Sequence, residues 1–285
     1  MNAPRIEGPL ISPGVLTELL ASPATAPTLL DVRWQLATGA DHAAYVQGHI
    51  PGAAFVDLDT QLADPPSKRG RHPLPGAEWF TDAMQAAGVS GSRPVAVYDA
   101  DTSMAAARAW WLLRYFGHPA VVVLDGGLAA WVAAGHPLNA GIETVRPGDF
   151  VASPGGMPVV AADQAAEIAT AGVLIDARAR ERYMGLAESV DRVAGHIPGA
   201  RSLPTSDNVD SHGRFLEAAR LRSAFEQLGV RDDVEVAAYC GSGITATHEV
   251  LALERAGFRA ALYPGSWSEW ISDPQRPVAR DAGRS

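Results

Sequence analysis

Short apolar runs alternate with longer amphipathic segments along most of the chain. This pattern predicts strands at residues 28–32, 94–98 and 120–124, and helices at residues 79–87 and 104–116. The first helix is expected to begin at Ser12, because serine is a good N-cap and the next residue is a proline. Strands that alternate with helices favour an α/β fold, with a mainly parallel sheet covered by helices on both faces.

The second half of the chain repeats the pattern of the first. The sequence Leu-x-Asp-x-Arg occurs at 29–33 and 174–178, and Gly-His-Ile-Pro-Gly-Ala occurs at 48–53 and 195–200. Two copies in the same order at similar spacing indicate a duplicated domain rather than a short-period solenoid. Glycines and prolines gather between the copies. We therefore expect domains at residues 9–138 and 159–280, joined by a linker at 139–158.

The single cysteine of the chain, Cys240, follows the apolar run 234–239 and precedes an amphipathic segment at 245–256. The first reads as a buried strand and the second as a helix. A cysteine at such a turn meets backbone N–H groups and the positive end of the helix dipole, which favour thiolate over thiol. The alternative is a small buried hydrophobic residue, and the glycines on either side of Ser242 favour the nucleophile.

Composition narrows the class of protein. The chain has 285 residues with a net charge of −9, which does not favour nucleic acid or a membrane surface as partner. One cysteine allows neither an internal disulfide nor a multi-cysteine metal site, and we expect no metal and no cofactor. The N-terminus has no apolar signal region, so a cytoplasmic location is expected.

These motifs resemble the tandem-domain rhodaneses, the thiosulfate and 3-mercaptopyruvate sulfurtransferases. The resemblance rests on the duplicated segments, on Cys-Gly-Ser-Gly-Ile-Thr at 240–245 and on Gly-Ser-Trp-Ser-Glu-Trp at 265–270. It implies two rhodanese-like domains and a Cys240 persulfide that carries sulfur from a small anionic donor to an acceptor. The position equivalent to Cys240 in the first copy is Asp99, which cannot form a persulfide. We expect the first copy to be structural; a cation bound by Asp99 and Asp101 is the alternative.

The loop after Cys240 is expected to hold the transferred sulfur. Glycines at 241 and 243 let backbone amides turn inward, and amides aimed at one sulfur stabilise negative charge. The resemblance implies substrate contacts from Gly241, Gly243, Ile244 and Thr245, although Thr245 is equally suited to cap the following helix. Rhodaneses that prefer thiosulfate carry cations in this loop, whereas Gly241 and Ser242 resemble the 3-mercaptopyruvate enzymes.

By family position, Arg182 and Arg192 match two arginines that hold the anionic end of the donor. A guanidinium group can bind a carboxylate through two hydrogen bonds and so fix its orientation. A solvated surface arginine is the alternative for each.

The resemblance also implies a proton-handling set of Ser242, Asp59 and His72, with Asp57 as the alternative acid. An imidazole titrates near neutrality and can deliver a proton to the departing enolate. His49 and His196 recur in both copies, including the one without a nucleophile, so we expect them to be structural.

Two rival functions can be compared with sulfur transfer, and the sequence nearly excludes the first. A phosphatase of the same fold needs an arginine six residues after the cysteine, where this chain has Ala246. A non-catalytic persulfide carrier or interaction module is the rival from another class. The acceptor is expected to be a thiol, such as thioredoxin or glutathione, or cyanide.

Overall fold

The computed structural model describes residues 8–280 and divides into two compact units, each considered by itself here. The first unit holds the chain up to Asp64, together with Pro75–Met157 and Ser211–Arg214. The second holds Pro65–Leu74, Pro158–Asp210 and the chain from Phe215 onward. The segment Pro65–Leu74 thus belongs to the second unit although it lies in the first half of the sequence.

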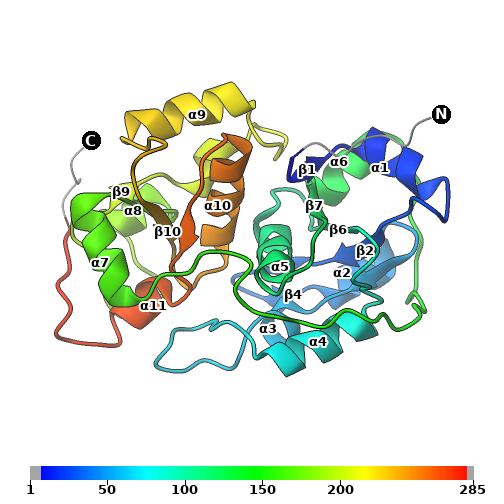
Figure 1. Ribbon diagram of the computed structural model, residues 1–285, viewed down its shortest axis with the longest axis horizontal. Helices are drawn as coiled ribbons and strands as arrows, with labels where there is room; N and C mark the ends of the chain where they lie inside the picture. Colours follow the sequence, from blue (N-terminus) through cyan, green and yellow to red (C-terminus); the bar gives the residue numbers. More distant parts are fainter. Residues whose placement is uncertain (1–7, 281–285) are drawn as a thin grey trace. The chain divides into compact units, whose positions relative to one another are not determined.

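A parallel sheet forms the centre of the first unit, with the strand order β1-β7-β6-β2-β5 (Figure 1). Its strands are β1 (Leu10–Ile11), β2 (Thr28–Asp31), β5 (Ala53–Phe55), β6 (Val95–Tyr98) and β7 (Val121–Leu124). The helices are α1 (Pro13–Leu20), α2 (His42–Gln47), α3 (Leu58–Gln61), α4 (Ala77–Ala86), α5 (Met104–Tyr115) and α6 (Gly127–Ala133). A small antiparallel pair, β3 (Trp34–Gln35) and β4 (Gly39–Ala40), completes the unit.

The second unit repeats this plan with the parallel strand order β11-β10-β8-β9. Its strands are β8 (Val173–Asp176), β9 (Arg201–Ser202), β10 (Val236–Tyr239) and β11 (Ala261–Leu262). The helices are α7 (Ala162–Ala171), α8 (Arg180–Tyr183), the 3-10 helix η1 (Thr205–Asn208), α9 (Ala218–Gln227), α10 (Thr245–Arg255) and α11 (Ser266–Trp270). A parallel bridge from Val159 to Leu262 occupies the place that β1 has in the first unit.

Helices cover both faces of the second sheet. Ala237 and Tyr239 of β10 pack in one apolar cluster with residues of α7 and α11. Side chains alternate between the faces of a strand, so the intervening residues face the opposite side, where α10 packs against β10. Figure 1 shows β10 between α7 and α10. The predicted fold class is confirmed.

The predicted elements are found with ends that differ by one or two residues. The first helix begins after Ser12, whose hydroxyl accepts a hydrogen bond from the N–H of Val15 at 3.3 Å. The strand expected at 234–239 begins at Val236, and α10 ends at Arg255. None of the helices within residues 8–280 is long and apolar enough to cross a membrane.

The duplicated motifs have the same structural task in each unit. Arg33 pairs with Asp31 at 2.8 Å and donates to the carbonyl of Gly48 at 2.8 Å. Arg178 pairs with Asp176 at 2.6 Å and donates to the carbonyl of Gly195 at 2.7 Å. The Asp-x-Arg motif therefore ties the end of a strand to the start of the Gly-His-Ile-Pro-Gly turn.

The two repeated histidines are structural, as predicted. His49 and His196 are each 1 % exposed. Their Nδ1 atoms lie 2.9 Å and 2.8 Å from the carbonyl oxygens of Tyr45 and Tyr183, respectively. Each ring stacks on the tyrosine whose carbonyl it meets.

Candidate active site

Cys240 directly follows β10, at the carboxyl end of the strand, where ligands of parallel sheets usually bind. Its side chain is buried, and its Sγ accepts a hydrogen bond from the N–H of Gly243 at 3.1 Å. Helix α10 begins five residues after the cysteine, so the positive end of its dipole lies toward the loop. Both features stabilise negative charge on this sulfur.

The start of α11 holds the cysteine loop in place. The Ser266 hydroxyl accepts from the N–H of Cys240 at 3.1 Å, and the Trp267 N–H donates to the carbonyl of Cys240 at 3.0 Å. The Ser268 N–H donates to the carbonyl of Gly241 at 2.9 Å. Ser266 is fully buried and has a φ of 52°, a left-handed conformation that non-glycine residues adopt at a cost. The sequence contained the Gly-Ser-Trp motif but gave no sign of this task.

Gly243 is required by the shape of the loop. Its φ is +82°, and a Cβ on this residue would lie 2.3 Å from the carbonyl oxygen of Pro264. Only glycine lets the backbone turn here so that its own N–H points at the sulfur.

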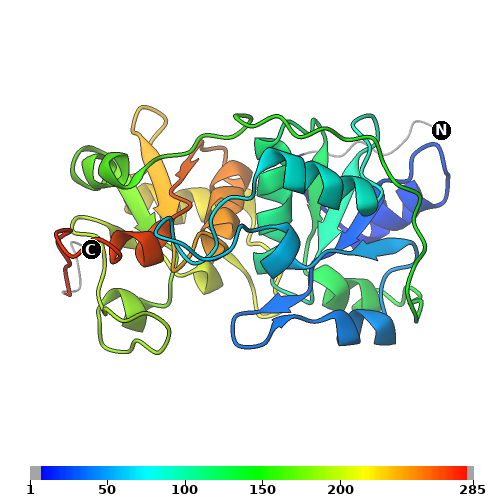
Figure 2. The same ribbon diagram turned by 90° about the horizontal axis from the view of Figure 1, so that it is seen from below.

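Ser242 and His72 lie together within the second unit. The Ser242 hydroxyl and Nδ1 of His72 are 2.8 Å apart, although the residues are 170 positions apart in the sequence. His72 enters this unit on the segment Pro65–Leu74, which runs beside α11 (Figure 2). The N–H of Arg71 fixes the segment there by donating to the Ser268 hydroxyl at 3.0 Å.

The two candidate acids lie in the first unit. Asp59 is exposed, and its Oδ1 accepts a hydrogen bond from Nε1 of Trp34 at 2.9 Å. Asp57 is the N-cap of α3 and accepts from the N–H groups of Asp59 at 2.9 Å and Thr60 at 3.2 Å. Asp57 thus has a structural task, while the pairing of Asp59 with His72 stays a prediction.

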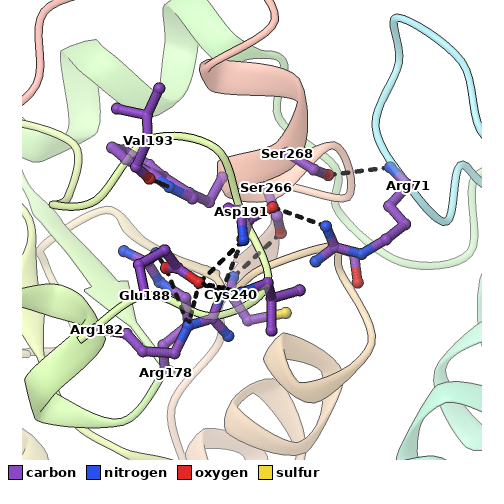
Figure 3. Close-up of polar contacts among 12 residues, drawn as sticks. Arg71, Arg178, Arg182, Glu188, Asp191, Val193, Cys240, Ser266 and Ser268 are labelled. Atoms are coloured by element: carbon purple, nitrogen blue, oxygen red, sulfur yellow. Dashed lines mark hydrogen bonds and ion pairs between the residues drawn. The ribbon is translucent and has the colours of Figure 1, made fainter. Parts of the chain in front are cut away.

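Arg182 on α8 lies beside the cysteine loop. Its Nη2 pairs with Asp191 at 2.7 Å and with Glu188 at 2.9 Å (Figure 3). Burial alone would raise the pKa of Glu188, but hydrogen bonds from Arg182 and from the N–H groups of Asp191 and Val190, together with the charge of Arg182, lower it below its usual value. A Cβ on Gly241 would lie 3.7 Å from both Nη atoms of Arg182, so this arginine faces the residue after Cys240.

Sequence reasoning missed Arg71. Its Nη1 pairs with Asp191 at 2.7 Å, on the carboxylate that also holds Arg182 (Figure 3). The only signal in the sequence was its place directly before His72. The partner, Asp191, is 3 % exposed and is held by the turn that begins at Glu188.

Arg192 points elsewhere. Its Nη2 donates to the carbonyl of Ile271, at the end of α11. The donor-binding role implied for Arg192 stays a prediction.

Ile244 and Thr245 complete the loop. Ile244 is buried and stands at the N-cap position of α10, without a side-chain hydrogen bond to the helix. Thr245 is the first residue within the helix, so the alternative that it caps α10 is wrong. Its contact with substrate stays a prediction.

Asp99 stands in the first unit at the position equivalent to Cys240, and its carboxylate accepts hydrogen bonds from backbone N–H groups that follow it. The N–H groups of Ser103 and Ala105 donate to it at 2.9 Å, and that of Ala106 donates at 3.3 Å. Burial outweighs these hydrogen bonds and raises the pKa of Asp99 to about 6. Donors surround this carboxylate as they would an anion, which speaks against the cation alternative. Residues 8–280 contain no group of three potential metal-binding side chains of His, Cys, Asp or Glu.

Comparison with known proteins shows the family to which the chain belongs. The family model of the rhodanese-like domain matches residues 12–134 and again residues 160–273. The chain belongs to the rhodanese family. This finding confirms the resemblance and the duplication inferred from the sequence.

Similar rhodanese-family proteins carry sulfurtransferase names. A Pseudomonas aeruginosa protein named as a probable 3-mercaptopyruvate sulfurtransferase is 46 % identical over 91 % of this chain and 95 % of its own length. A Mycobacterium tuberculosis protein, SseB, named as a thiosulfate sulfurtransferase, is 42 % identical over 89 % and 90 %. The crystal structure of SseA from Escherichia coli, described as a 3-mercaptopyruvate sulfotransferase, matches with a TM-score of 0.80 and 32 % identity over 92 % and 100 %. The rhodanese described here is accordingly a sulfurtransferase.

Proposed function

We propose that the protein transfers sulfur from 3-mercaptopyruvate, through a persulfide on Cys240, to a thiol acceptor. The observation that carries the proposal is the loop itself. The Cys240 sulfur accepts a hydrogen bond from a backbone N–H group, and the next two residues, Gly241 and Ser242, carry no charge. The Ser242 hydroxyl lies within hydrogen-bond distance of His72. A neutral loop with a proton-handling pair suits a donor whose leaving group is a carbon that must be protonated.

The chemistry follows from these groups. The Cys240 thiolate attacks the sulfur of 3-mercaptopyruvate, an S–S bond forms and the C–S bond breaks. The electron pair of the C–S bond goes to carbon as an enolate. The donor's thiol proton passes through Ser242 and His72 to that carbon, which gives pyruvate. An acceptor thiolate then attacks the outer sulfur of the persulfide and releases the Cys240 thiolate.

The donor's carboxylate is held by Arg182 in this proposal. Its guanidinium faces Gly241, and a bidentate contact would both neutralise and orient the carboxylate. The proposal assigns loop contacts to Gly241, Gly243, Ile244 and Thr245.

Pyruvate release tests the proposal. Purified protein incubated with 3-mercaptopyruvate and a thiol should release pyruvate, and the protein alone with the donor should gain about 32 Da, the mass of one sulfur on the nucleophile. Cys240→Ser should lose both signals. A Cys240 that gains sulfur from a persulfidated partner but releases no pyruvate would instead show a sulfur carrier.

Thiosulfate is the second candidate donor, favoured by the name of the Mycobacterium tuberculosis relative. Steady-state kcat/KM for the two donors, measured with the same acceptor, decides between them. The cytoplasmic location, and thioredoxin, glutathione or cyanide as acceptor, stay predictions for cell fractionation and for rate measurements with each acceptor.

A further inference from the structure

The loop after Cys240 has no charged side chain at 241 or 242, so the cations that bind the donor's carboxylate must come from other segments. A small carboxylate donor needs local cations, because the whole chain has a net charge of −9. Among the arginines predicted for this task, Arg182 faces the loop, whereas Arg192 donates to the carbonyl of Ile271. A second cation must therefore come from elsewhere if two guanidinium groups hold the donor.

We infer that Arg71 is the second cation that binds the donor's carboxylate. Together with Arg182 it would hold the carboxylate beside Gly241, where a Cβ would lie. A Cβ on Gly241 would lie 3.2 Å from Nη2 of Arg71 and 3.7 Å from each Nη of Arg182. Both guanidinium groups thus border the same small space beside the residue that follows the nucleophile. All three residues belong to the second unit.

The pairing of the individual nitrogen atoms supports this assignment. Nη1 of Arg71 and Nη2 of Arg182 each bind Asp191, at 2.7 Å. Nη2 of Arg71 lies nearest to the Cβ position of Gly241, and the two Nη atoms of Arg182 are equally distant from it. Nε of Arg71 is buried and finds no acceptor among residues 8–280. Asp191 therefore anchors one nitrogen of each guanidinium, and Glu188 also holds Nε and Nη2 of Arg182. In this inference Nη2 of Arg71 and Nη1 of Arg182 are the donors for an incoming anion.

Asp191 acts here as a positioning residue. It is buried, and its backbone N–H donates to Glu188 at 3.0 Å, so the carboxylate has a fixed place between the two arginines. Two cations that would repel each other are held close by one shared anion. A donor carboxylate beside Gly241 would be held by hydrogen bonds from both guanidinium groups.

Alkylation of Cys240 tests the inference without turnover. Iodoacetate and iodoacetamide have nearly the same size, but only iodoacetate carries a carboxylate. Each forms a C–S bond with the thiolate and releases iodide, and Cys240 is the only cysteine in the chain, so intact mass reports this site alone. The ratio of the two rates measures the attraction of the site for a small carboxylate.

Wild type should favour iodoacetate more than a free thiol such as glutathione does. Arg71→Gln should lower the rate ratio about tenfold, because a charge-assisted hydrogen bond is lost. Arg71→Lys should retain part of the preference, since charge remains without the planar fork. Arg220→Gln, at an exposed position of α9 in the same unit, is the matched control and should leave the ratio unchanged.

Several outcomes would overturn the inference. An Arg71→Gln change that slows both reagents equally would show a structural role for Arg71. If Arg192→Gln lost the preference for iodoacetate and Arg71→Gln kept it, Arg192 would be the second carboxylate-binding residue. The inference rests on the proposed function only for the identity of the donor: a lost iodoacetate preference without any pyruvate release would refute that function and leave Arg71 as an anion-binding residue. Pyruvate release with an unaltered KM in Arg71→Gln would refute the inference alone.

Discussion

Nδ1 of His72 lies 2.8 Å from the hydroxyl oxygen of Ser242, two residues after Cys240. The contact joins a segment of the first half of the sequence to the cysteine loop within one compact unit. It gives the loop an imidazole, which can both accept and donate a proton.

Replacement of His72 should therefore slow the step that protonates the leaving enolate. We expect His72→Gln to lower kcat with 3-mercaptopyruvate about 100-fold or more, as for loss of a general acid. Alkylation of Cys240 by iodoacetamide should change far less, because that reaction needs no proton delivery. An equal loss in both reactions would mean that His72 supports the loop rather than the proton transfer.

The two loop glycines should respond differently to alanine. Gly243→Ala places a Cβ 2.3 Å from a backbone carbonyl and forces a φ of +82° on an L-residue, which costs about 1–3 kcal/mol of stability and moves the N–H away from Sγ. Gly241→Ala places its Cβ 3.2 Å from the flexible end of Arg71, which can shift. We expect Gly243→Ala to lose most activity and several degrees in Tm, and Gly241→Ala to lose little stability. Similar melting temperatures for the two variants would contradict this reading of the loop.

Donor preference should depend on the side chains at 241 and 242. The pair Gly241→Arg and Ser242→Lys adds positive charge beside Arg71 and Arg182. The ratio of kcat/KM for thiosulfate to that for 3-mercaptopyruvate should rise about tenfold, which is ~1.4 kcal/mol of differential transition-state binding. Gly241→Ala is the neutral control. An unchanged ratio would place the choice of donor outside this loop.

A buried carboxyl group on α10 should make stability depend on pH. Burial raises the pKa of Glu249 from 4.5 to about 8, although Asn208 donates to its carboxylate at 2.8 Å. Between these two pH values the folded protein holds a proton that the unfolded chain has released, so stability falls as pH rises from about 4.5 to about 8.

Glu249→Gln should remove this part of the pH dependence, because glutamine cannot ionise. Tm measured from pH 6 to pH 9 should fall less steeply in the variant than in the wild type. Asp99, with a pKa raised to about 6, adds a similar decline at lower pH, which Asp99→Asn should remove separately. Parallel Tm curves for wild type and Glu249→Gln would show that Glu249 is ionised in the folded protein.

The sequence by itself determined the duplication, the α/β class and the place of Cys240 between a strand and a helix. Those features are local or periodic: alternating apolar runs, a motif found twice, and one cysteine between a strand and a helix. The cap of α1 at Ser12 could be predicted because its partner, Val15, is three residues away. The structural histidines could be predicted because they recur in both copies of the domain.

Only the tertiary structure decided that Arg71 lies beside the cysteine loop and that Arg192 does not point the same way. Arg71 and His72 reach the second unit because the segment Pro65–Leu74 packs beside α11, and Arg71 meets Asp191 across 120 positions of sequence. Arg192, which the family pattern placed beside Arg182, is instead directed to the carbonyl of Ile271. Such contacts depend on the path of loops and on the packing of elements far apart in the chain, and residue spacing along the sequence carries no record of either.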